Sequence, residues 1–166
     1  MKILFLVYHG FSDESGISKK IHYQVKGMEQ NGHEVHLCYY DFDTSGNRCR
    51  YVNGQVIHNY GKGKLAAIRS RLQLDCIYNY CIEHSIELMY VRSFMNASPV
   101  LVRLFKRIKS VGINSVMEIP TYPYDKEVSG YCLNDMVSLQ IDKLFRNQLA
   151  SQMEAIVTFS DADQIF

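Results

Sequence analysis

The sequence predicts a three-layer α/β domain with a mostly parallel, doubly wound sheet. Short apolar segments typical of buried strands alternate along the chain with segments whose apolar residues recur at helical spacing. The first of these segments, residues 3–7, is apolar at every position, as in a parallel strand that helices cover on both faces. The length of 166 residues suits one such domain, and no Pro/Gly/Ser-rich linker or internal repeat interrupts it.

Composition narrows the class of protein. A net charge of +1 and 47% apolar residues favour an ordinary globular protein over a disordered tail or a dedicated nucleic-acid binder. The five cysteines show no CxxC spacing and are odd in number, so they predict neither a zinc site nor a closed set of disulfides. The apolar start is too short for a signal peptide or a membrane span. Together these features favour the reducing cytoplasm.

The first third of the chain predicts a βαβ unit. A buried strand at residues 3–7 leads into a loop at 9–16, and a second strand follows at 34–40. Between them lies a predicted helix that ends at Asn31-Gly32, a pair typical of a left-handed cap. The apolar face of this helix is expected at Ile17, Ile21, Val25 and Met28.

The middle of the chain predicts a hairpin, a helix and a strand. Asn53-Gly54, flanked by short β-prone segments, indicates a tight hairpin or two short edge strands. A strand is expected at residues 88–91. The helix before it should bury one apolar stripe: Leu65, Ile68, Leu72, Cys76 and Tyr80.

Ser98-Pro99 predicts the start of the next helix, because serine is a good N-cap and proline is favoured in the first turn. Gly112 marks its end, and a strand at residues 114–118 follows. Its apolar face is expected at Val100, Leu104, Ile108 and Val111.

Pro120 and Pro123 exclude a central ladder after that strand, so a long loop is expected there. A helix at 136–149 and a buried strand at 155–159 complete the pattern. Val137, Ile141, Leu144 and Phe145 are the expected apolar positions of this helix. Ser160 and Asp163 look like a capping box, which predicts the first turns of a further helix and a chain that is part of a longer protein.

Ligands of open α/β sheets bind beyond the carboxyl ends of the strands, which directs attention to the loop after the first strand. This loop ends in Ser15, Gly16 and Ile17 at a helix N-terminus, where backbone amides and the helix dipole favour a phosphate. The spacing matches neither GxGxxG nor a P-loop. The alternative is that Gly16 only relieves a tight turn.

Two further strand ends carry candidate side chains. Arg92 could hold a phosphate or a carboxylate, or could simply form a surface ion pair. Glu118 could accept a hydroxyl proton, and Tyr122 and Tyr124 could offer flat faces to a sugar. Alternatively, the tyrosines pack the loop and Glu118 pairs with a nearby base. His9 stands at the end of the first strand, and the six histidines show no metal-ligand spacing.

Several of these segments resemble the N-terminal domain of family-4 GT-B glycosyltransferases. They are Met1 to Leu6, Ser15-Gly16-Ile17-Ser18, the predicted helix Lys20 to Gln30, Asn31-Gly32-His33-Glu34-Val35-His36, Leu88 to Arg92 and Ala155 to Ser160. The resemblance runs, with gaps, over nearly the whole chain. It implies that residues 1–166 form a Rossmann-like, acceptor-side domain, whose partner, the C-terminal donor-binding domain with its glutamate-rich motif, is not in this sequence.

The resemblance implies transfer of a sugar, of hexosyltransferase type, from a nucleotide-sugar to a hydroxyl of a glycan or glycolipid, with retention of configuration. The Gly16 turn would approach the donor diphosphate, while His9, Arg92, Glu118, Tyr122 and Tyr124 would line the acceptor side. Many members carry histidine near the position of Glu118. No metal and no cofactor are implied, and residues 1–166 alone are expected to be inactive.

Polysaccharide assembly at the inner face of the membrane is a setting consistent with the family. Peripheral membrane contact therefore stays open, although the basic residues considered for it are expected to be solvated: Lys19, Lys20, Lys26, Arg103, Lys106, Arg107 and Lys109. Two other functions remain open on the same fold, a non-catalytic nucleotide- or sugar-binding module and a GT-B-type sugar-nucleotide epimerase.

Overall fold

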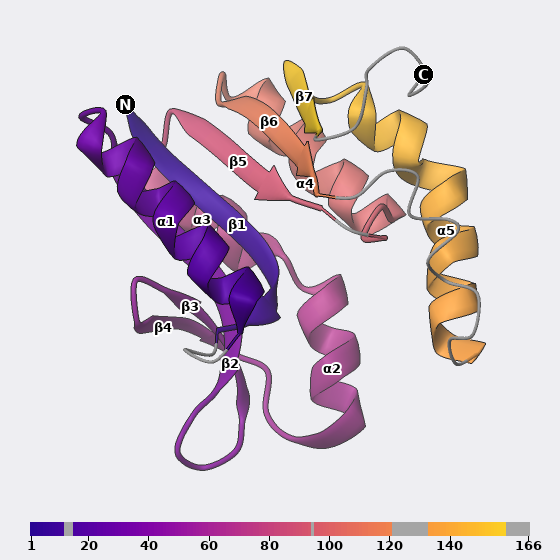
Figure 1. Ribbon diagram of the computed structural model, residues 1–166. Helices are drawn as coiled ribbons and strands as arrows, with labels where there is room; N and C mark the ends of the chain where they lie inside the picture. The colour runs from indigo at the N-terminus through magenta and orange to yellow at the C-terminus, as the bar shows by residue number, and fades with distance from the viewer. Residues whose placement is uncertain (12–14, 94, 121–132, 159–166) are drawn as a thin grey trace. The chain divides into compact units, whose positions relative to one another are not determined.

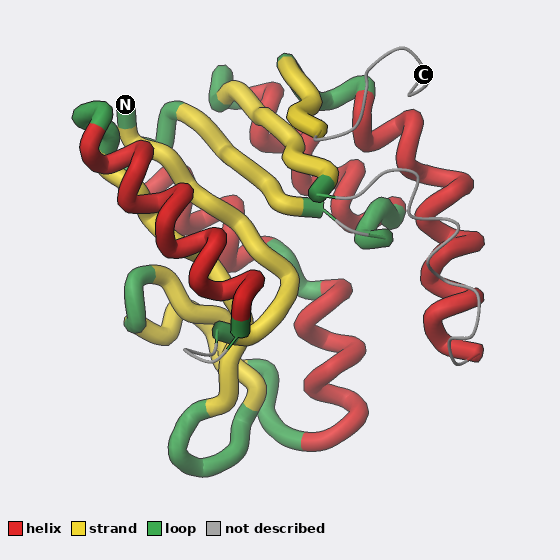
Figure 2. The backbone as a smooth tube through the Cα atoms, in the orientation of Figure 1, coloured by secondary structure: helices red, strands yellow, loops and turns green. Residues whose placement is uncertain are grey.

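The computed structural model describes residues 1–166 except 12–14, 94, 121–132 and 159–166, and it omits the side chains of His9, Leu133 and Asn134. The described residues form an α/β fold of seven strands and five helices (Figure 2). The strand order is β4-β3-β2-β1-β5-β6-β7, so the chain first adds strands on one side of β1 and later on the other. The α/β class and the mostly parallel sheet are confirmed, and they are compatible with a Rossmann-like fold.

The chain divides into two compact units, Met1–Met89 and Tyr90–Phe166, which are described separately below. The division falls inside β5 (Leu88–Arg92). The sequence shows no linker there, because the strand is a regular apolar segment.

The first unit is built around β1 (Lys2–Gly10), whose residues 3–7 are at most 2% exposed. It pairs in parallel with β2 (Glu34–Phe42), and α1 (Gly16–Gln30) connects the two. Figure 1 shows α1 on one face of β1 and α3 on the other. Gly32 has a φ of 82°, which confirms the predicted left-handed cap after α1.

The predicted hairpin is confirmed as β3 (Arg48–Val52) and β4 (Gln55–Asn59), both antiparallel to their neighbours. Asn53 and Gly54 have φ values of 47° and 81°, as a type I′ turn requires. The Asn53 side chain also accepts a 2.8 Å hydrogen bond from the Leu37 amide. The turn is thereby tied to β2.

The prediction of a single helix with one apolar stripe before β5 is wrong. The segment forms two helices, α2 (Gly63–Leu72) and α3 (Asp75–Glu83). The side chains that α2 buries are small, Ala66 and Ser70, whereas the large apolar side chains are exposed: Leu65 by 64%, Ile68 by 53% and Leu72 by 57%. Because Ala66 and Ser70 have small side chains, α2 can lie close to the sheet with these residues on its buried face.

The second unit contains α4 (Pro99–Ser110), β6 (Asn114–Ile119), α5 (Leu133–Ala150) and β7 (Ala155–Thr158). β6 and β7 are parallel, and α4 packs against β6 and α5. Ser98 caps α4 through its hydroxyl, which accepts from the Leu101 amide at 3.3 Å, with Pro99 in the first turn. The predicted start of α4 is confirmed.

Several expected core positions are exposed in the structure. On α5 the inward residues are Leu139, Asp142 and Leu149, because the Asp142 carboxylate accepts a 2.9 Å hydrogen bond from the Ala97 amide and turns that face inward. β7 is only half-buried rather than fully buried. The following residues were expected on the buried faces of helices but are exposed to solvent: Ile17, Val111, Val137, Ile141 and Leu144. The predicted helix after Ser160 lies outside the described residues.

The Asn53 turn yields a stability prediction. Asn53→Ala removes the side-chain acceptor for the Leu37 amide and places alanine at a positive φ, so we expect the free energy of unfolding to fall by about 1–2 kcal/mol. Urea denaturation measures the change. Asn79→Ala, on exposed α3 surface, is the control and should be neutral within about 0.5 kcal/mol. Equal effects of the two changes would contradict the role given to Asn53.

Candidate functional site

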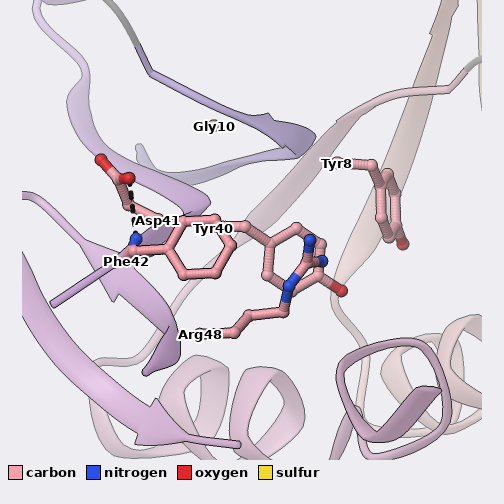
Figure 3. Close-up of a pocket in the computed structure, with 6 residues that line it drawn as sticks. All are labelled: Tyr8, Gly10, Tyr40, Asp41, Phe42 and Arg48. Atoms are coloured by element: carbon pink, nitrogen blue, oxygen red, sulfur yellow. Dashed lines mark hydrogen bonds between the residues drawn. The ribbon is translucent and has the colours of Figure 1, made fainter. Parts of the chain in front are cut away.

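A small pocket lies at the carboxyl ends of β1 and β2 in the first unit (Figure 3). Its volume is about 110 Å³, and its lining residues are Tyr8, Gly10, Tyr40, Asp41, Phe42 and Arg48. The two strands are parallel, with Gly10 in register with Tyr40, so both end at the same edge. A Cβ on Gly10 would lie 3.3 Å from the Tyr40 carbonyl oxygen, which explains why glycine suits this close approach.

The chemistry of this pocket is aromatic with one cation and one carboxylate. The Arg48 guanidinium carbon lies 5.5 Å from the ring centroids of both Tyr40 and Phe42, and its Nη1 lies 3.4 Å from the Ser70 hydroxyl. The Asp41 carboxylate accepts from the Phe42 amide at 2.8 Å. Flat rings beside groups that donate and accept hydrogen bonds suit a small polar ligand with apolar faces.

The phosphate site predicted from the sequence would lie at the N-terminus of α1. The Ser15 hydroxyl accepts from the Ser18 amide at 3.4 Å and caps the helix, and Gly16 is the first helical residue. Gly16 is not among the residues with positive φ, so a left-handed backbone conformation does not explain this glycine. A Cβ at this position would meet no described atom within 4 Å outside its own helix and neighbours. Ile17 is 53% exposed.

In the second unit, Glu118 forms a buried polar cluster. Its side chain is fully buried, and its Oε1 accepts from Nη1 of Arg92 at 2.8 Å while its Oε2 accepts from the Tyr90 hydroxyl at 2.9 Å. Tyr90 and Arg92 come from β5 and Glu118 from β6. The structure thus brings together Arg92 and Glu118, which the sequence analysis named separately.

This cluster matches the alternative in which Glu118 pairs with a base, except that the pair is buried rather than on the surface. The Arg92 side chain is only 9% exposed. Burial is the main cause that raises the pKa of Tyr90 well above its usual value, and the nearby charge of Glu118 is the second. The Tyr90 hydroxyl therefore remains a donor. A buried carboxylate with these partners can orient the ends of β5 and β6.

Three named candidates cannot be placed. Tyr122 and Tyr124 lie outside the described residues. His9 belongs to β1, at the expected strand end, but its side chain is outside the described part of the structure. In the ranges that are described, no group of three or more His, Cys, Asp or Glu side chains could hold a metal ion.

Comparison with known proteins gives no identification. No family model matches the chain, and no curated protein matches it. Among the helices that are described, none is both long and apolar enough to cross a membrane.

The sequence analysis missed the pocket residues around Arg48. The available signal was the alternation in β3, where Arg48 and Arg50 are two apart and therefore lie on the same face of the strand. That alternation alone does not reveal that the shared face points into the core. The pairing of Tyr40 with Arg50 and of Phe42 with Arg48 in the ladder does reveal it.

The buried pair yields a second stability prediction. Glu118→Gln removes the charge that compensates Arg92, so we expect a loss of about 3–5 kcal/mol in the free energy of unfolding. Tyr90→Phe removes the hydrogen bond to Glu118 without removing a charge and should cost about 1 kcal/mol. Urea denaturation at neutral pH compares the two. If Glu118→Gln cost no more than Tyr90→Phe, the pair would have no structural role.

Proposed function

We propose that this chain is the N-terminal, acceptor-side half of a two-domain GT-B glycosyltransferase of the retaining family-4 type. The whole protein would transfer a sugar from a nucleotide-sugar donor to a hydroxyl acceptor of a glycan or glycolipid. The resemblance in the sequence motivates the proposal. The α/β fold with its mostly parallel sheet is compatible with it at the level of fold class.

The observation that carries the proposal is the open space over the first residue of α1. Gly16 begins the helix in ordinary helical conformation, and neither backbone strain nor crowding by described atoms requires glycine there. The first turn of a helix leaves amide groups without intrahelical partners, and they point along the positive end of the dipole. A missing side chain at that point keeps the amides accessible to a phosphate.

The proposed chemistry relies on position and charge. Transfer with retention needs the donor and the acceptor hydroxyl held in fixed geometry, together with stabilisation of the diphosphate that departs. The α1 N-terminus would stabilise the negative charge of the departing diphosphate. Arg92 and Glu118 would act as positioning residues, because their contacts with each other fix the carboxyl ends of β5 and β6.

The prediction concerns the whole encoded protein. Gly16→Val places a branched side chain in front of the α1 amides, so we expect turnover to fall on the order of 100-fold while thermal stability stays unchanged. Nucleoside diphosphate release from a panel of nucleotide-sugars, measured with acceptor extracts, gives the rate. Gly27→Ala lies on the same helix and should retain full turnover. A folded and fully active Gly16→Val protein would remove this turn from the donor site.

Peripheral contact with an anionic membrane is part of the proposal, and α2 supports it. The helix exposes Leu65, Ile68 and Leu72, and its charged residues are all basic: Lys64, Arg69 and Arg71. An apolar stripe beside basic side chains is typical of helices that lie in the interface of anionic bilayers. The exposed stripe supports membrane contact through α2 in preference to the basic residues considered from the sequence.

Vesicle cosedimentation tests this surface. Ile68→Glu adds a negative charge to the centre of the stripe, so we expect binding to anionic phospholipid vesicles to fall at least about tenfold, with little effect on stability because Ile68 is 53% exposed. Ile82→Glu, at a position of α3 that is 47% exposed, is the matched control and should bind normally. Equal binding by both variants, or no binding by the original protein, would reject membrane contact through α2.

A further inference from the structure

Two arginines on one face of β3 have an environment that the proposed function does not explain. Arg48 and Arg50 face the same side of the strand and pair across the ladder with Phe42 and Tyr40. Arg50 is fully buried, and its guanidinium carbon lies 3.5 Å from the ring centroid of Tyr40. Arg48 is half-buried against the same ring, at 5.5 Å. Two positive charges therefore share one aromatic wall.

Neither arginine has a carboxylate partner among the described residues. Nε and Nη2 of Arg50 are buried without a hydrogen-bond partner there, and its Nη1 makes a long contact of 3.5 Å to the Val7 carbonyl. Arg48 contacts the Ser70 hydroxyl at 3.4 Å. Removing a charge from water is costly unless an opposite charge or strong hydrogen bonds compensate it.

The side chains around Arg50 do not supply that opposite charge at neutral pH. Burial is the main cause that raises the pKa of Tyr8, Tyr40 and Tyr60 above the usual value for tyrosine, so their hydroxyls stay protonated. Burial likewise raises the pKa of the Cys38 thiol to about 11. The faces of the rings attract a cation, yet they carry no net charge.

The pocket of about 110 Å³ lies against the same aromatic wall. Tyr8, Tyr40 and Arg48 line it, and the buried Tyr8 hydroxyl has no hydrogen-bond partner in the described structure. A space of this size greatly exceeds the roughly 10–15 Å³ that one water needs. The pocket thus combines a free volume, an arginine that forms no ion pair with a described residue, and a tyrosine whose buried hydroxyl has no described hydrogen-bond partner.

We propose that this pocket binds the oxyanion, phosphate or carboxylate, of a small hydroxylated ligand. Arg48 donates to the oxyanion, the Tyr8 hydroxyl is a neutral donor beside it, and Arg50 contributes positive potential from the core next to Tyr40. The Asp41 carboxylate on the pocket wall would repel an anion in contact with it, so it accepts a hydroxyl of the same ligand instead. The proposal is independent of glycosyl transfer, because it requires only binding.

Isothermal titration of the full chain tests the proposal with inorganic phosphate and with acetate, each against chloride at matched ionic strength. We expect saturable binding of at least one oxyanion, and the stronger one identifies phosphate or carboxylate as the preferred group. Arg48→Gln should weaken that binding at least about tenfold, since it removes a charge-assisted hydrogen bond. Arg103→Gln, on the exposed surface of α4, is the matched control and should bind as the original protein does.

Arg50→Met tests the buried charge alone, because Arg50 is not one of the residues that line the pocket. Methionine retains apolar volume without the uncompensated charge, so we expect the unliganded protein to melt at the same or a higher temperature while oxyanion affinity falls several-fold. Chemical-shift mapping on the original chain guards against misfolded variants: phosphate or acetate should move the amide signals of residues 40–42 and 48. No saturable binding, equal losses in Arg48→Gln and Arg103→Gln, or shifts confined to other segments would overturn the proposal.

Discussion

The burial of β1 on both faces is the constraint on which the first unit depends. Five consecutive apolar residues, Ile3 to Val7, are almost completely removed from water, and this is possible only when helices cover the strand on each side. The chain meets that requirement with α1 on one face of β1 and α3 on the other. Polar side chains then have access to solvent chiefly beyond the strand ends, where the pocket and the α1 N-terminus lie.

Local sequence signals predicted the elements whose shape depends on local chemistry. Asn53-Gly54 adopts positive φ at both positions, and Ser98 caps its helix, because these residue types have few alternatives in such places. The stripe at Leu65, Ile68 and Leu72 was misleading, since periodicity identifies a helical face but not the neighbour that covers it. The core side of α2 is set by how closely a helix with Ala66 and Ser70 can approach β3.

For the candidate site residues as well, the sequence predicts their positions along the chain but not their contacts with residues far away in the sequence. Arg92 and Glu118 could be placed at strand ends from the sequence, whereas their contact depends on the register of β5 and β6 and joins residues 26 positions apart. The Arg50 environment is harder still to foresee. A charged residue in a strand ordinarily predicts a solvated face, and only the pairing with Tyr40 reveals that this one is buried among rings and a thiol.

The pairing of β1 with β2 contains an irregularity that affects how this strand end can vary. Between Leu6 and Gly10 the chain advances four residues, while between their partners Cys38 and Tyr40 it advances two. The two extra residues preserve the alternation of side chains between faces, so Tyr8 stays on the side of Leu6. Length changes here are therefore tolerable in pairs, whereas a single insertion would exchange the inward and outward residues of everything that follows in the strand.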